Sequence, residues 1–134
     1  MKVFVIKTLS TLALVEAAFA FDSSGRAPAG LLVNGASNPL AIDRETARFT
    51  WRSPDTQRRA TQTAYQILVS TDPAGLAAEK ADWWDSGKMD SDKSASVEYA
   101  GKTLAPAKRF WWKVRTWDQT GHPGPYSASA YFDT

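Results

Sequence analysis

The stretch from Arg109 to Asp118 constrains the fold more than any other part of the chain. On one side of an extended backbone it would place three large apolar residues and a threonine: Phe110, Trp112, Val114 and Thr116. The other side would alternate tryptophans with positive charges: Trp111, Lys113, Arg115 and Trp117. This period of two is typical of a β-strand with one face on a core. Because each aromatic ring can bury roughly 150–250 Å², we expect the rest of the domain to fold against this strand.

The remaining chain reads as further short strands separated by turn signals such as Asn34-Gly35 and Gly121-His-Pro123. Extended segments are expected at 31–33, 40–42, 48–51, 63–70, 82–88, 94–99 and 127–132 in addition to 109–117. Only 73–80, after the Asp72-Pro73 start signal, favours a helical turn. About seven short strands with almost no helix predict an all-β, immunoglobulin-like antiparallel β-sandwich. The chain has no cysteine, which favours the fibronectin type III kind.

Alternation along these segments also predicts which side chains form the core of the sandwich. The residues expected there lie on the inward faces of their strands: Trp51, Tyr65, Phe110, Trp112 and Val114.

The first twenty residues have the layout of a secretory signal peptide. A start with Lys2 and Lys7 precedes an apolar run over 8–15, and Ala18-Phe-Ala20 forms a small-x-small cleavage pattern. The run is too short to span a bilayer, and the alternative interpretation is a buried strand or helix of the domain. We therefore expect a signal peptide at 1–20, a flexible polar lead-in at 21–30 and the sandwich at 31–134, in a secreted, extracellular protein.

Composition excludes several classes of function. The 16 basic and 14 acidic residues give a net charge of +2, and their scattered positions do not favour nucleic acid. Without cysteine, and with His122 as the single histidine, the chain offers neither a thiolate nor a multi-histidine metal site. We expect no cofactor, no metal, and no nucleic-acid or membrane partner.

Three stretches together resemble one known family. The first is Asn38-Pro-Leu-Ala-Ile-Asp43 followed by Arg48-Phe-Thr-Trp51. The second is Gln62-Thr-Ala-Tyr-Gln-Ile-Leu-Val69 followed by Trp84-Asp-Ser-Gly-Lys88, and the third is Arg109 to Asp118 followed by Gly121 and Tyr126-Ser127. In this order and spacing they are similar to the N-terminal fibronectin-III-like domain of bacterial and fungal α-L-rhamnosidases, glycoside hydrolase family 78. The resemblance covers residues 30–133.

Members of that family are large secreted or periplasmic inverting glycosidases that release terminal L-rhamnose. In them this module precedes further β-sandwich domains and a helical barrel that holds the catalytic acids. The resemblance therefore implies a non-catalytic N-terminal structural module whose partners are the downstream domains of the same polypeptide. The alternative is a stand-alone secreted module that binds carbohydrate or mediates adhesion.

The chain departs from the family at two positions. Ala41 stands where members commonly have glycine, so a positive φ at this position would be strained. Phe110 stands where many members have a tyrosine whose hydroxyl bonds back to the preceding loop. Phenylalanine keeps the ring and loses that bond, at a cost of about 1 kcal/mol.

Two pairs of carboxylates, Asp82 with Asp85 and Asp90 with Asp92, are close in sequence. Inverting glycoside hydrolysis needs two carboxyl groups about 6.5–9.5 Å apart, one of them with a raised pKa. Both pairs lie in polar, turn-rich segments with nothing to raise a pKa. We expect them to be solvated surface groups and expect no catalytic residue in this chain.

Three tryptophans, Trp111, Trp117 and Trp83, are the candidate functional residues. Trp111 and Trp117 are expected to point outward from one strand, and two such rings could dock a neighbouring domain. They could instead pack within their own domain, with Lys113 and Arg115 as cation–π partners, or form a platform for sugar rings. The sequence leaves these three alternatives open, with carbohydrate as a further candidate partner.

Overall fold

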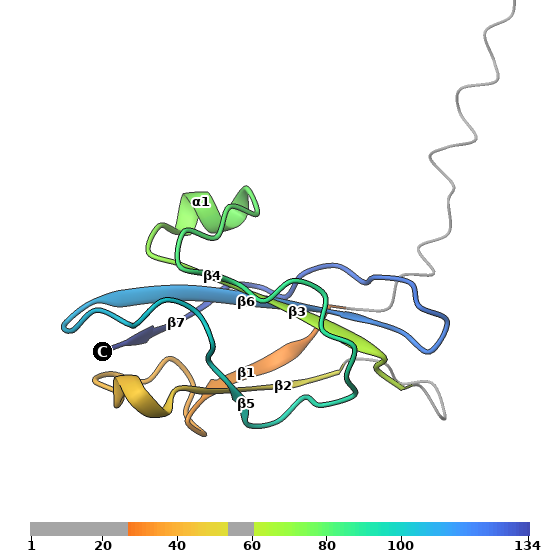
Figure 1. Cartoon of the computed structure of the whole chain (residues 1–134), viewed down its shortest axis with the longest axis horizontal. Coiled ribbons are helices and arrows are strands. Elements are labelled where there is room, and N and C mark those ends of the chain that lie inside the picture. The colour runs from red at the N-terminus through yellow and green to blue at the C-terminus, as the bar shows by residue number, and fades with distance from the viewer. Residues whose placement is uncertain (1–26, 54–60) are drawn as a thin grey trace, which may run out of the picture.

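A computed structural model describes residues 27–53 and 61–134, and the predicted signal peptide (1–20) lies outside the described residues. The described part of the chain is all-β, with one helix and one 3-10 turn between its strands (Figure 1). The strands are β1 (Ala29–Val33), β2 (Arg48–Arg52), β3 (Ala64–Ser70), β4 (Trp84–Asp85), β5 (Val97–Glu98), β6 (Arg109–Trp117) and β7 (Ala130–Asp133). The helical elements are η3 (Arg44–Thr46) and α1 (Pro73–Ala77).

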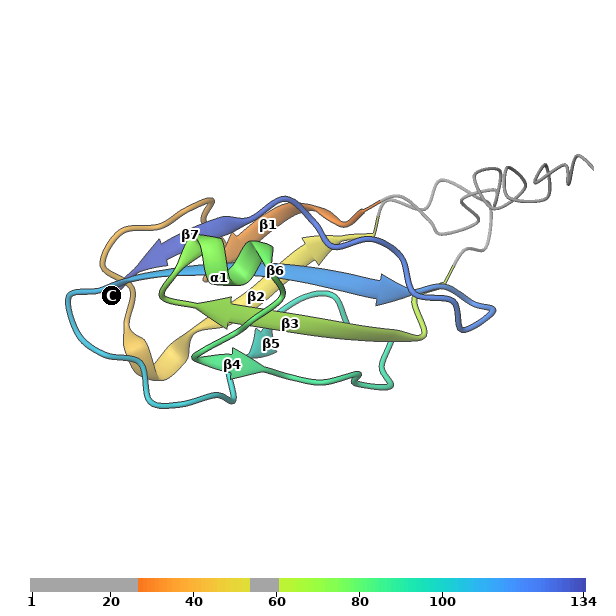
Figure 2. The same cartoon turned by 90° about the horizontal axis from the view of Figure 1, so that it is seen from above.

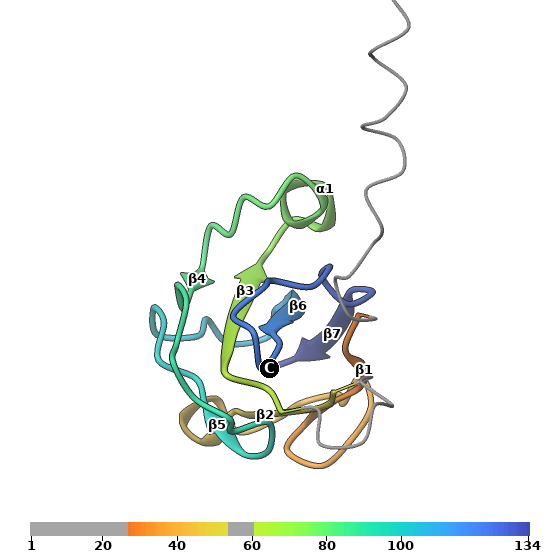
Figure 3. The same ribbon diagram turned by 90° about the vertical axis from the view of Figure 1, so that its right-hand side faces the viewer.

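The strands form two antiparallel sheets that pack face to face. One has three strands in the order β1-β2-β5, and the other has four in the order β4-β3-β6-β7. In constant-type immunoglobulin domains the fourth strand pairs within the sheet of the first, second and fifth. Here β4 pairs with β3 instead, which is the fibronectin type III arrangement. The predicted sandwich is confirmed, and the end-on view shows its two layers (Figure 3).

β6 is the longest strand and pairs with two neighbours, β3 and β7, in the four-stranded sheet. It pairs with β3 from Ala64↔Trp117 to Ser70↔Trp111 and with β7 from Arg109↔Asp133 to Trp112↔Ala130. Its inward side chains, Phe110, Trp112 and Val114, are completely buried. The period of two along 109–117 thus has the face toward the core that the sequence predicts.

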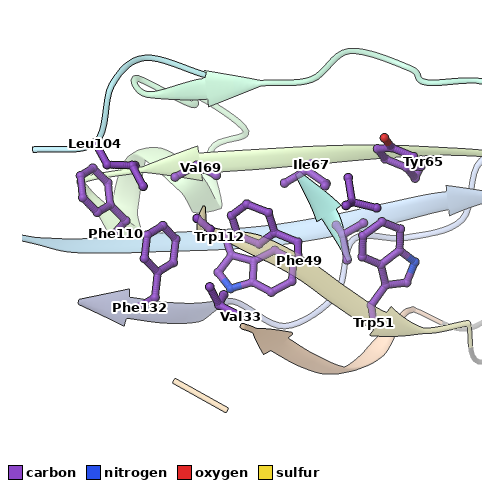
Figure 4. Packing of buried hydrophobic residues seen from close by; sticks show 13 residues of the cluster. Val33, Phe49, Trp51, Tyr65, Ile67, Val69, Leu104, Phe110, Trp112 and Phe132 are labelled. Carbon is purple, nitrogen blue, oxygen red and sulfur yellow. The ribbon is translucent and has the colours of Figure 1, made fainter. Parts of the chain in front are cut away.

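A single hydrophobic cluster fills the space between the sheets (Figure 4). Its buried members are Val33, Ala47, Phe49, Trp51, Tyr65, Ile67, Val69, Val97, Leu104, Phe110, Trp112, Val114 and Phe132. All five expected core residues are among them. Several rings meet at tilted or edge-on angles, as in the 4.6 Å approach of Phe49 to Trp112 and the 5.3 Å approach of Trp51 to Tyr65, a geometry that aromatic pairs prefer.

Some element boundaries differ from those that the sequence predicts. β1 begins at Ala29, so the last two residues of the expected lead-in belong to the strand. Residues 40–42 form no strand; Ile42 N instead donates to the Asp133 carbonyl oxygen (2.8 Å). Because a loop can satisfy the edge of a sheet with isolated hydrogen bonds, an extended sequence pattern does not require a strand there.

The structure shows the consequences of the two departures from the family, at Ala41 and at Phe110. Ala41 has φ +57°, so the expected strain is present. The Phe110 ring, which carries no hydroxyl, stacks on Phe132 with centroids 5.4 Å apart. In the loop before β6, a different tyrosine bonds to the backbone: the Tyr99 hydroxyl donates to the Lys102 carbonyl oxygen (2.5 Å).

Candidate functional site

The candidate site is the outer face, which is the side of the four-stranded sheet that points away from the other sheet. At one end of this face, Trp117 of β6 is only 7% exposed. It stands beside the small side chain of Ala64 on β3, and two cations lie over its ring, Lys88 Nζ at 5.5 Å and the Arg115 guanidinium at 4.9 Å. Trp117 thus lies on the outer face, as expected, but it is covered. Its own domain covers the ring, as in the self-packing alternative.

The middle of the outer face is closed by α1 and by the segment before β7. Leu76 of α1 and Leu68 of β3 are each 1% exposed, and α1 lies above β3 and β6 (Figure 2). α1 starts where Asp72 Oδ1 accepts from Ala74 N (3.0 Å), as an N-cap should. Sequence alternation assigns Leu68 to the outer face but does not show that a helix covers it.

Lys113 of β6 is almost buried in this covered part of the face. Its Nζ lies 4.5 Å from the Tyr126 ring, which also has the Arg115 guanidinium at 4.9 Å. Burial lowers the pKa of Lys113, an effect that the charge of Glu79 opposes. Arg115 is thus the cation–π partner of Trp117, whereas Lys113 lies over a tyrosine instead of a tryptophan.

The other end of the outer face is more open. Trp111 is half-buried and meets Tyr131 of β7 at 5.3 Å between ring centroids. The Arg109 guanidinium lies 4.0 Å from the centre of the Tyr131 ring. Arg109 also donates two hydrogen bonds to the Asp133 carboxylate, from Nε (2.7 Å) and from Nη2 (2.9 Å). These bonds hold the pKa of Asp133 below its usual value.

The structure does not bring the three candidate tryptophans together. Trp111 pairs with Ser70 and Trp117 with Ala64, at opposite ends of β3, and six residues of strand span roughly 20 Å. Trp83 lies elsewhere. It is half-buried with its ring 5.2 Å from Phe110 and packs against the core. The three tryptophans therefore form no shared platform. Trp111 and Tyr131 form a partly exposed aromatic pair on the outer face.

Asp82 and Asp85, the first of the two pairs considered as catalytic, accept hydrogen bonds from neighbouring segments. Asp82 accepts from Thr71 N (2.9 Å) and Thr71 Oγ1 (2.6 Å). Burial raises the pKa of Asp82, but these hydrogen bonds outweigh burial and keep the pKa below its usual value. Asp85 accepts from Gln66 Nε2 and from Gly87 N, both at 2.8 Å. Because its pKa is lowered, Asp82 is held in its charged form and is a poor proton donor for glycoside cleavage.

Among the described residues, 27–53 and 61–134, no group of three or more histidine, aspartate or glutamate side chains is placed to hold a metal ion. In the same ranges, no helix has the length and apolar character needed to cross a membrane. His122 is exposed in the turn after β6, with Nδ1 2.6 Å from Thr120 Oγ1.

Large hydrophobic side chains are exposed at two places among the described residues. Leu40, which is 69% exposed, lies in the loop between β1 and β2, and Met89, which is 45% exposed, follows β4. The Asn38–Ile42 loop bonds to β7, whereas Met89 lines a hollow with Trp84 and Val97. β7 and β4 form opposite edges of the four-stranded sheet (Figure 3). The two exposed side chains therefore belong to different edges of the sandwich.

A sequence model described as "Rha78A-like, N-terminal immunoglobulin domain" matches residues 28–134. The chain belongs to this family. The resemblance that the sequence motifs indicate is thereby confirmed, and the matched range contains every strand of the sandwich.

Curated relatives of this Rha78A-like domain are much longer proteins. This chain is 39% identical to an α-L-rhamnosidase of Formosa agariphila over 102 residues, which are 76% of this chain and 11% of that protein. It is 40% identical to an α-L-rhamnosidase of Streptomyces avermitilis over 96 residues, 72% of this chain and 9% of that protein. The chain thus spans about a tenth of the length of the curated relatives it matches.

Solved structures give the same relationship in three dimensions. The α-L-rhamnosidase from Dictyoglumus thermophilum matches with a TM-score of 0.80 and 34% identity, over 84% of this chain and 13% of that one. The Streptomyces avermitilis α-L-rhamnosidase complexed with L-rhamnose gives 0.76 and 36%, over 81% and 10%. The Rha78A-like domain therefore corresponds to a small part of each of these chains.

Proposed function

We propose that this chain is the non-catalytic N-terminal structural module of a secreted α-L-rhamnosidase, and that it supports the domains that follow it. The observation that carries the proposal is the match of residues 28–134 to an N-terminal domain family whose relatives are named α-L-rhamnosidases. The engaged carboxylates of the described part agree with a module that takes no part in chemistry. The signal-peptide pattern of residues 1–20 supports secretion.

Activity measurements on two lengths of the polypeptide test the proposal. We expect the 134-residue chain to release no p-nitrophenol from p-nitrophenyl α-L-rhamnoside, and the polypeptide extended through its downstream sequence to release it. Hydrolysis by the 134-residue chain would show that the module is catalytic. Failure of the extended polypeptide to hydrolyse several rhamnosides would overturn the assignment to a rhamnosidase.

Secretion has its own test. Expression with the native N-terminus in an exporting host should deliver a protein to the medium or periplasm that begins at Phe21. Retention of the intact N-terminus in the cytoplasm would contradict this part of the proposal.

The Trp111–Tyr131 pair favours one other candidate function, carbohydrate binding, because partly open aromatic rings can stack on sugars. Titration with rhamnosides while tryptophan fluorescence is recorded would detect it, with Trp111→Phe as the control. A saturable response that Trp111→Phe abolishes would favour the binding module. No response at millimolar sugar would favour the structural role.

A further inference from the structure

We infer that the domain following Thr134 in the same polypeptide docks onto one particular surface of this module. We call this surface the exit face and define it by Leu40, Arg109, Trp111, Tyr131 and Asp133. The inference rests on the proposed function, because the partner is a downstream domain of the same enzyme. It goes further in assigning the contact surface and in making Leu40 its apolar anchor.

The first observation is that the loop carrying Leu40 is fastened to the last strand of the domain. Asn38 Oδ1 accepts from Tyr131 N (2.9 Å), and the Pro39 carbonyl oxygen accepts from Asp133 N (2.9 Å). Ile42 N then donates to the Asp133 carbonyl oxygen (2.8 Å). The loop therefore caps the free edge of β7. Leu40 and Ala41 lie between the two hydrogen bonds to Asp133, next to the point where the chain leaves the domain.

The second observation is that this turn exposes the Leu40 side chain to solvent and has a strained backbone. Leu40 is 69% exposed, the largest exposure among the large hydrophobic side chains of 27–53 and 61–134. The backbone of this turn is left-handed at Asn38 (φ +46°), which asparagine tolerates, and at Ala41 (φ +57°), where the conformation is unfavourable for a residue with a Cβ. Backbone strain clusters at sites that bind ligands or switch conformation, so the strain at Ala41 together with the exposure of Leu40 supports a contact at this turn.

The third observation is that the chain leaves the domain from a fixed position. Thr134 N donates to the Lys108 carbonyl oxygen (2.9 Å), and Thr134 Oγ1 donates to that of Ala105 (2.6 Å). The two hydrogen bonds from Arg109 hold the side chain of Asp133. Because the last residue is fastened to the loop before β6, a domain that begins shortly after it starts beside the exit face.

Two facts identify the partner that docks on the exit face: most of the outer face is already covered by this domain, and the curated relatives are much longer than this chain. α1 and the Lys113–Tyr126 contact close the middle of the outer face, and two cations close the Trp117 end. Partly open aromatic area remains at Trp111 and Tyr131, beside the loop that carries Leu40. About nine-tenths of each curated relative lies outside the matched part. A downstream domain of the same polypeptide is thus the partner that the exit position brings to this surface.

Thiol accessibility tests the inference, since the 134 residues contain no cysteine. Leu40→Cys is prepared in the 134-residue chain and in the polypeptide extended through the next domains. Maleimide labelling is followed by mass spectrometry, with the unsubstituted extended polypeptide as background. We expect the thiol at position 40 to react about tenfold or more slowly in the extended polypeptide, because a docked surface is protected. Equal rates in the two lengths would overturn the inference.

Met89→Cys is the matched control, because Met89 is the other exposed large hydrophobic residue and lies away from the chain exit. Its thiol should react equally fast in both lengths. Slowing at both positions would indicate general shielding by the extended chain and would also overturn the assignment of the exit face.

A second pair of variants, Leu40→Asp and Met89→Asp, examines coupling between the domains. Leu40→Asp should leave the melting temperature of the 134-residue chain unchanged and lower that of this domain in the extended polypeptide. Met89→Asp should leave the difference between the two lengths unchanged. The same shift for Leu40→Asp in both lengths would mean that Leu40 acts only within its own domain.

Rhamnosidase activity of the unsubstituted extended polypeptide separates this inference from the proposed function. Slow labelling at position 40 without hydrolysis would retain the docking surface and remove the rhamnosidase assignment. Hydrolysis with equal labelling rates would retain the enzyme and remove the exit face.

Discussion

Trp117 and Trp111 stand on the same side of the same strand, yet their surroundings differ. Trp117 lies beside a small alanine and has cations from β6 and from Lys88 over its ring. Trp111 lies next to Tyr131 of the last strand, β7. The side of the strand on which a residue lies therefore does not decide how exposed its side chain is. The exposure depends on which segments, distant in sequence, pack over that side.

The largest expected effect in this comparison is at Trp117. Because the ring is 7% exposed, Trp117→Ala should lower the free energy of unfolding of the 134-residue chain by about 3 kcal/mol. Urea denaturation followed by circular dichroism measures this loss. A loss below that of Trp111→Ala would show that the Trp117 end is not the closed end.

Trp111→Ala should have a smaller effect on the same chain, about 1–2 kcal/mol, since the half-buried ring loses one aromatic partner and part of its buried area. The same urea titration provides the value. In the extended polypeptide the loss should grow, because the docked domain would bury more of the ring. An identical loss in both lengths would count against docking at Trp111.

Ala41→Gly should raise the free energy of unfolding by about 0.5–1 kcal/mol, because glycine relieves the left-handed strain at φ +57° but adds freedom to the unfolded chain. Ala128→Gly is the control, since Ala128 is exposed and is not among the described residues with positive φ. That control should be neutral or destabilising. Thermal unfolding distinguishes the two, and a loss of stability in Ala41→Gly would contradict the strain.

The smallest effect is expected at the ion pair of Arg109 and Asp133. Hydrogen bonds from Arg109 lower the pKa of Asp133 from its ordinary 3.8. The stability that they contribute is therefore present above pH 3.8 and lost as the pH falls through the lower pKa of the folded state. Asp133→Asn should flatten this part of the pH dependence, by a small amount because the pair is partly exposed. Chemical denaturation across this acidic range tests it, and an unchanged slope would contradict the assignment.

Much of the fold could be predicted because its determinants are local. Alternation along 109–117 predicts the buried side of β6, and turn signals predict the approximate positions of the short strands. The expected helical turn at 73–80 is present as α1 (Pro73–Ala77). The motifs around Ala41 predict strain wherever a positive φ occurs at that position, and the structure has φ +57° there.

The candidate site was predicted less well, for a physical reason. Trp111, Trp117 and Trp83 look equivalent in sequence, but their environments depend on contacts between segments that are distant in the chain. Lys88 lies over the Trp117 ring, Trp83 packs against Phe110, and Tyr131 contacts Trp111. Periodicity carries no information on such contacts.

By itself, then, the sequence determined the antiparallel sandwich, the inward face of β6 and the family. These depend on residue spacing along single segments, which the chain carries whatever its neighbours do. Only the tertiary structure decided that Trp117 is covered, that Trp83 packs against the core and that Leu40 lies beside β7. Each of these outcomes requires segments far apart in sequence to meet, and packing between the sheets and along the edge of β7 determines where they meet.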